Sequence, residues 1–187
     1  YKDGHLIDKD LENENVNESI ELVTTNLIEA SNAHIVKPRK VLEEKVTYKI
    51  IGTEIFVNVQ VQFKEDCYLL EYSGLQSNGE YYNQVFIPNS QVLGFVDLGE
   101  EQLLSGDFKQ YGLVDQIVLR NKDTKNILRI KLLKHTIFDL GEGTSLVESG
   151  QPPLNKMYFK LVKNTYKEVS KGYKYSFLGC YQFSQMD

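Results

Sequence analysis

The sequence VTYKII-GT-EIFVNVQVQF-KED-CYLLEYSG, residues 46–74, contains three strand-like runs joined by two tight turns. A further run, QVFIPNSQVLGFVD, follows a polar loop and occupies residues 84–97. The second run alternates strictly, because its odd-numbered positions from Ile55 to Phe63 are apolar and Asn58, Gln60 and Gln62 lie between them. Such alternation is typical of an antiparallel strand with one buried face. The stretch therefore predicts the first half of a small antiparallel barrel.

The remainder of the chain supplies further strands. Residues 116–120 and 127–133 are expected to form a hairpin around the polar turn 121–125, and residues 136–140 a last strand. The aromatic tail 173–183 is expected to pack back on the sheet as an extended segment. The count comes to about seven strands.

Two segments have helical spacing of their apolar residues. Val16, Ile20, Val23 and Leu27 recur at intervals of three and four, which predicts a helix over residues 15–30. A second stripe runs through residues 154–169, with Pro153 at its start and Gly172 after its end. We therefore expect a mainly β (α+β) fold in which a C-terminal amphipathic helix caps the barrel. Residues 1–44 would form an acidic extension with one helix and a basic connector, and residues 45–187 the barrel domain.

Composition limits the function. The 187 residues carry a formal net charge of −5, which argues against a generally basic nucleic-acid binder. The acidic residues concentrate in the first 36 positions, whereas the last 37 are basic. Two distant cysteines form neither a disulfide framework nor a zinc site. The sequence contains no apolar run of the roughly 20 residues that span a bilayer.

The order of elements resembles the pleckstrin-homology (PH) fold. Tyr48-Lys49-Ile50-Ile51-Gly52, then FVNVQVQF-KED-CYLLEY, is similar to the first three strands of a PH domain, and Phe86-Ile87-Pro88 to the fourth. An acidic leader and a Tyr-rich tail also resemble the acylated PH-domain proteins of apicomplexan parasites. This resemblance implies a peripheral membrane module that recognises phosphatidic acid or a phosphoinositide, on an organelle of regulated secretion and with an N-terminal lipid anchor.

The basic residues nearest the expected lipid site lie in the connector and the first strands. They are Lys37, Arg39, Lys40, Lys45, Lys49 and Lys64. A second basic face would come from Lys156, Lys160, Lys163 and Lys167 on the expected C-terminal helix. However, the second strand has no Lys or Arg, whereas tight phosphoinositide binding needs several convergent donors. The alternative is a PH-like scaffold that binds a protein partner and no lipid.

No residue set indicates catalysis. His5, His34 and His135 are isolated, and no nucleophile elbow or Walker motif is present. We therefore expect no enzymatic activity, no cofactor, no metal and no nucleic-acid partner. The expected location is cytoplasmic, on the surface of a membrane.

Overall fold

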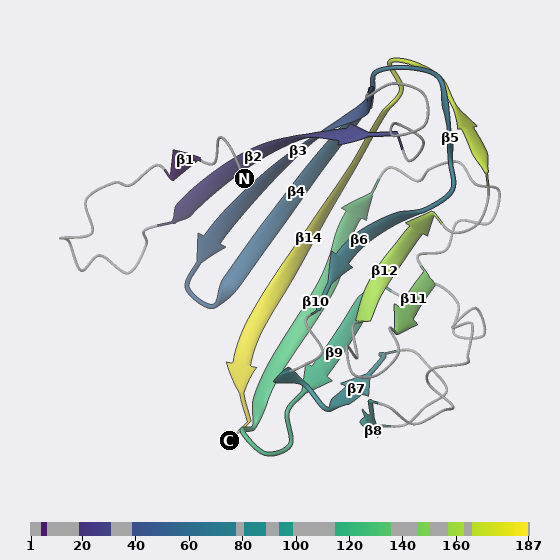
Figure 1. Cartoon of the computed structure of the whole chain (residues 1–187). Helices are drawn as coiled ribbons and strands as arrows, with labels where there is room; N and C mark the ends of the chain where they lie inside the picture. Colours follow the sequence, from purple (N-terminus) through teal and green to yellow (C-terminus); the bar gives the residue numbers. More distant parts are fainter. Residues whose placement is uncertain are drawn as a thin grey trace.

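The computed structural model describes residues 5–6, 19–30, 39–77, 81–88, 94–98, 115–135, 146–149, 157–162 and 166–186. All regular elements in these ranges are β-strands (Figure 1). The first eight strands are β1 (His5–Leu6), β2 (Ile20–Glu29), β3 (Lys40–Ile51), β4 (Glu54–Phe63), β5 (Cys67–Leu69), β6 (Tyr72–Gln76), β7 (Gln84–Phe86) and β8 (Val96–Asp97). The remaining six are β9 (Gln116–Arg120), β10 (Asn126–His135), β11 (Leu146–Ser149), β12 (Met157–Val162), β13 (Lys167–Val169) and β14 (Lys174–Gln185).

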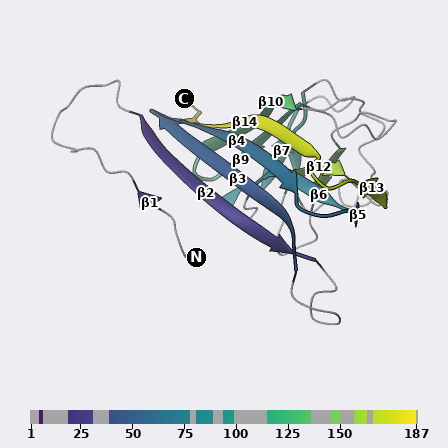
Figure 2. The same cartoon turned by 90° about the horizontal axis from the view of Figure 1, so that it is seen from above.

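Nine strands form one antiparallel sheet in the order β1-β2-β3-β4-β14-β10-β9-β7-β8. The four strands β2, β3, β4 and β14 lie side by side as long ribbons in both views (Figures 1 and 2). The C-terminal strand β14 is inserted between β4 and β10, so the two halves of the chain join through its last element. Gly52 makes the β3–β4 turn at a φ of 56°, which favours glycine.

The register directs one face of this sheet toward the core. Val57, Val59 and Val61 of β4 pair with Tyr48, Val46 and Glu44 of β3, so these side chains share a face. On β14, Tyr175, Phe177 and Gly179 continue the same rows. Most of these apolar side chains are at most 5% exposed. We call this side the core face, and the opposite side, where Asn58 and Gln60 are exposed, the back face.

A smaller sheet packs on part of the core face. It has the order β11-β12-β6, and Met157 and Phe159 of β12 are fully buried in the core. Leu75 of β6 lies directly against Gly179 of β14, because a Cβ placed on Gly179 would be 2.1 Å from Leu75 Cδ1. A separate ribbon pairs β5 with β13 at one end of the molecule, beside the end of β4 (Figure 1).

The expected N-terminal helix over residues 15–30 is wrong. Its described part is β2, which pairs with β3 from Ile20↔Ile50 to Glu29↔Lys40. Five of the ten residues of β2 are β-branched, and such side chains favour a strand over a helix. The predicted boundary between residues 44 and 45 falls inside β3, and the division of the chain there stays a prediction.

The expected C-terminal helix is wrong as well. The described residues of that segment form β12 and β13, two strands that pair with β6 and β5. Fully buried Met157 and Phe159 are two residues apart on β12, which is strand periodicity. The strand expected at 136–140 lies outside the described residues. The extended tail is confirmed as β14.

The PH-like barrel is therefore corrected. Among the described strands, β1 pairs only with β2 and β8 only with β7, so the large sheet is open. The capping helix that defines the PH arrangement is replaced by strands. The correct prediction is the local one: β4 has the alternating buried face that its sequence indicated.

Candidate binding pocket

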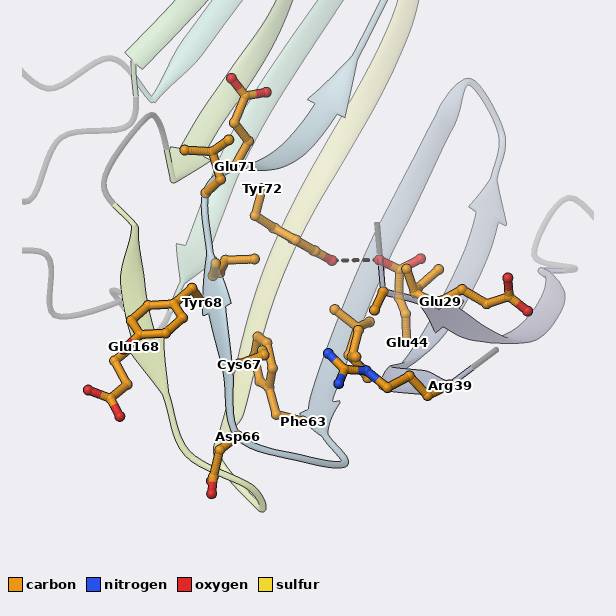
Figure 3. A pocket seen from close by; sticks show the side chains of 16 residues that line it. Glu29, Arg39, Glu44, Phe63, Asp66, Cys67, Tyr68, Glu71, Tyr72 and Glu168 are labelled. Carbon is orange, nitrogen blue, oxygen red and sulfur yellow. Dashed lines mark hydrogen bonds between the residues drawn. The ribbon is translucent and has the colours of Figure 1, made fainter. Parts of the chain in front are cut away.

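A pocket of about 760 Å³ opens between the end of the β2–β3 hairpin and the segment of residues 66–72, which includes β5 (Figure 3). The core face of β3 forms one wall through Leu42 and Glu44, and Phe63 lies at the end of β4. The opposite wall is the chain from Asp66 to Tyr72. The pocket thus lies where the ribbon of β5 and β13 leaves the end of the large sheet.

The central polar group of the pocket is the carboxylate of Glu44. Tyr72 donates its hydroxyl hydrogen to Glu44 Oε2 over 2.5 Å (Figure 3). Asn26, the cross-strand partner of Glu44 on β2, donates from Nδ2 to Oε1 over 3.3 Å. Three strands therefore fix one carboxylate, and the remaining lone pairs of its two oxygens can accept hydrogen bonds from a ligand.

The Tyr72 hydroxyl is held in its protonated form. Burial raises the pKa of Tyr72 well above its ordinary value, and the neighbouring charge of Glu44 raises it further. The ring is positioned by edge contacts with Tyr175 and Phe177, at centroid distances of 6.0 and 6.5 Å. Tyr72 therefore acts as a fixed hydrogen-bond donor to Glu44 throughout the physiological pH range.

The electrostatic character of the pocket is acidic. Five carboxylates lie among its lining residues, those of Glu29, Glu44, Asp66, Glu71 and Glu168. Arg39 is the one basic residue among the described lining residues, and its Nε forms an ion pair with Glu65 Oε1 at 2.9 Å. A negatively charged ligand would be repelled by this set of charges.

Apolar and aromatic surfaces complete the pocket. Leu42 and Phe63 are almost fully buried beneath it, whereas Ile28 is 40% exposed on the β2 side. Tyr68 of β5 also lines the pocket and is 70% exposed, and its ring lies beside Glu168 of β13 (Figure 3). The pocket therefore offers both apolar contact area and hydrogen-bond acceptors, a combination typical of small-molecule sites.

Of the residues expected to bind lipid, those that the structure describes do not converge on one site. Arg39 is paired with Glu65, Lys40 with Glu29 at 2.5 Å, and Lys64 with Glu43 at 2.9 Å. Lys45 and Lys49 are exposed on the back face of β3, away from the pocket. Lys37 lies outside the described residues.

The second basic face is not a helical stripe. Lys160 belongs to β12 and Lys167 to β13, while Lys156 and Lys163 lie outside the described residues. Because β12 and β13 belong to different sheets, these lysines do not share one face of a single element.

Sequence reasoning missed Glu44 and Tyr72. The sequence pattern places Glu44 in the connector before the first expected strand. The signal was present, because Leu42, Val46, Tyr48 and Ile50 alternate with the same phase and place Glu44 on an apolar face. A charged residue on a buried face is unusual and is accompanied by a partner.

No group of three or more His, Cys, Asp or Glu side chains within the described ranges could hold a metal ion. In the same ranges, no helix has the length and hydropathy required to cross a membrane.

No family model matches the chain, and no curated protein matches its sequence. Several solved structures resemble its fold at low identity. A galactose 1-epimerase from Lactobacillus acidophilus has a TM-score of 0.46 and 10% identity over 91% of this chain and 64% of that one. A putative aldose 1-epimerase from Escherichia coli K12 has a TM-score of 0.41 and 8% identity, over 98% and 69%. A galactose mutarotase-like protein from Lactobacillus casei has a TM-score of 0.43 and 12% identity, over 97% and 73%.

The chain spans about two thirds of the length of these proteins, and the TM-scores lie below the level at which a shared fold could be argued. Among the described residues, the open sheet and the strands in place of a capping helix contradict the PH fold. The assignment to PH-domain proteins, with its lipid-binding, exocytic function and its PH-like scaffold alternative, is therefore corrected. The expectation that the chain is not an enzyme is corrected too, because it rested on finding no candidate catalytic group, whereas the pocket contains the fixed carboxylate of Glu44. A protein partner, the absence of a nucleic-acid partner, and the cytoplasmic, membrane-surface location stay predictions.

Proposed function

We propose that the protein binds a carbohydrate in the pocket beside Glu44. The observation that supports this proposal is a carboxylate fixed by two donors on the wall of an acidic, partly apolar pocket. Sugar hydroxyls donate hydrogen bonds to such a carboxylate. The C–H faces of a sugar ring can lie against the apolar side chains of the pocket, such as Ile28 and Leu42.

The charge of the pocket favours a neutral ligand over an anionic one. A phospholipid headgroup or a sugar phosphate would bring negative charge beside Glu44 and the other carboxylates. Arg39, the one basic residue among the described lining residues, is already partly neutralised by its ion pair with Glu65. A neutral sugar is not repelled by these carboxylates. Its hydroxyl groups can donate hydrogen bonds to the carboxylate oxygens of the pocket, which outnumber the donors of Arg39.

The names of the similar solved structures refer to galactose and aldoses. The pocket supports the proposal independently of them, since those resemblances are too distant to transfer an activity. In this chain the fixed carboxylate could bind a hydroxyl or accept a proton from one. Binding and turnover are therefore measured separately.

The test is saturation-transfer NMR with galactose, glucose, mannose and N-acetylglucosamine. With the wild-type protein, at least one of these sugars should show a saturation-transfer signal, which reports binding. Glu44→Gln should reduce its affinity about tenfold or more, because a charge-assisted hydrogen bond is replaced by a neutral one. Glu43→Gln is the matched control. Glu43 is the neighbouring residue but lies on the back face and pairs with Lys64, so this change should leave binding unaltered.

Two outcomes would contradict the proposal. One is the absence of binding to every neutral sugar of the panel by folded wild-type protein, and the other is equal binding by wild type and Glu44→Gln. Polarimetry of freshly dissolved α-anomers then separates a binder from a mutarotase. Faster mutarotation by wild type, lost in Glu44→Gln, would add catalysis to binding.

A further inference from the structure

Tyr68 lines the pocket and exposes its ring to solvent. It lies on β5, directly opposite Glu168 of β13, and is 70% exposed. Both residues line the pocket, and their side chains lie side by side on the ribbon of β5 and β13 (Figure 3). An aromatic ring so exposed gains little from burial in this protein.

Tyr166 is the second exposed aromatic residue of this ribbon. It immediately precedes β13, has a φ of 46° and is also 70% exposed. A bulky residue in the left-handed region is strained, and glycine or asparagine would occupy this position at lower cost. Burial does not compensate for the strain. Strained residues without a packing role are more frequent at functional sites.

The two rings belong to one small surface. Tyr166 is two residues from Glu168, and Glu168 is the cross-strand partner of Tyr68. Two residues of chain and one strand pair put the two Cα atoms within about 12 Å of each other. The two rings are therefore close enough to contact the same sugar unit, and Tyr68 itself lines the pocket.

We propose that Tyr68 and Tyr166 form a second subsite, which makes the ligand an oligosaccharide rather than a single sugar. This inference rests on the carbohydrate-binding function proposed above. Glu44 holds the first unit by hydrogen bonds, and the two tyrosine rings stack against the next unit outside the pocket. The aromatic rings thus favour a ligand of at least two sugar units, and the carboxylate of Glu44 favours one with free hydroxyl groups.

The test compares disaccharides with their monosaccharides. Cellobiose, lactose and maltose are titrated beside glucose and galactose, with the wild-type protein and the variants Tyr166→Gly and Tyr68→Ser. The wild type should bind at least one disaccharide more tightly than either monosaccharide. Each variant should lose about threefold to tenfold in disaccharide affinity, the usual worth of an aromatic contact, and leave monosaccharide affinity unchanged.

Tyr166→Gly should fold at least as stably as wild type, because glycine relieves the strained φ. The matched control is Tyr81→Ser, which removes a similarly exposed tyrosine side chain (67%) elsewhere on the protein. Tyr81 lies beside the β9–β10 turn, where its backbone carbonyl accepts a hydrogen bond from Asn121 Nδ2. It should not change either affinity.

The outcomes separate the two proposals. Monosaccharide binding with no gain for any disaccharide, or a gain that both variants retain, would overturn the second subsite and leave the pocket proposal standing. Failure of every mono- and disaccharide to bind the folded wild type would overturn both.

Discussion

Gly179 is required by a contact between the two sheets. A Cβ at this position would lie 2.1 Å from Leu75 Cδ1 and 2.9 Å from the carbonyl oxygen of Lys131, which belongs to the backbone and cannot rotate away. Gly179→Ala should therefore lower the free energy of unfolding by about 1–3 kcal/mol, the usual cost of overpacking, as measured by urea denaturation. The sequence gives no indication of this role, because Leu75 and Gly179 are more than 100 residues apart.

Gly74→Ala provides the graded comparison. A Cβ at Gly74 would lie 3.0 Å from Leu161 Cδ1, which is the end of a flexible side chain. Gly74→Ala should therefore lower the free energy of unfolding less than Gly179→Ala does. An equal or larger loss for Gly74→Ala would contradict the packing of β6 on β14.

Buried tyrosines make the stability depend on alkaline pH. Burial raises the pKa of Tyr181 to about 12, and raises the pKa values of Tyr72 and Tyr175 further. The unfolded chain loses these protons near pH 10, whereas the folded chain retains them. The stabilisation is therefore complete below about pH 10 and is lost as the pH rises toward the folded pKa values.

Urea denaturation between about pH 8 and about pH 11.5 tests this sign. The contribution of these tyrosines to the free energy of unfolding should not change with pH between about pH 8 and about pH 9, and it should fall above about pH 10. Tyr181→Phe should reduce the slope, although it also loses the hydrogen bonds of its hydroxyl with the backbone of Gln76. A free energy that stays flat above about pH 10 would show that the rings are exposed, because their pKa values would then be the same in the folded and unfolded chain.

At the scale of elements, β2 is where sequence and structure differ most instructively. Ile20, Val23 and Leu27 have helical spacing, but in β2 Ile20 lies on the core face whereas Val23 and Leu27 lie on the back face. Leu27 is 52% exposed. The apolar spacing of β2 does not show strand alternation, because β2 is near the edge of the sheet and neither of its faces is fully buried. By contrast, β4 is central, and its sequence shows the alternation plainly.

Cysteine cross-linking tests the pairing of β2 with β3. Thr25 and Lys45 are opposite each other and exposed on the back face. Paired Cα atoms in an antiparallel ladder are about 4.5–5.5 Å apart, within the range that a disulfide bridges. Thr25→Cys with Lys45→Cys should therefore form a disulfide under mild oxidation, detected by mass spectrometry of non-reduced peptides.

The control pairs Thr25→Cys with Lys49→Cys. Lys49 is opposite Glu21, four residues further along the ladder, and should not react with position 25. Equal cross-linking of both pairs, or none in either, would contradict the register and would favour a separate N-terminal helix.

At the scale of the whole molecule, the sequence predicts strands better than it predicts their order. Local alternation and turns identify β4 and the hairpin of β9 and β10. Nothing local indicates that β14 joins β4 to β10, because that arrangement depends on contacts between distant segments. The pocket has the same origin: Glu44, Tyr72 and Glu168 come from separate regions of the chain and meet only when the ribbon of β5 and β13 folds beside β3.

The most direct test of the central claim is a backbone amide NMR titration with galactose and glucose, each compared with its 6-phosphate. A neutral sugar should shift the amide signals around Glu44, Tyr72 and Tyr68, and the phosphorylated sugar should bind more weakly because the pocket is acidic. Tighter binding of the phosphates, or shifts confined to the back face around Lys45 and Lys49, would show that the protein recognises anions and that the pocket beside Glu44 is not its site.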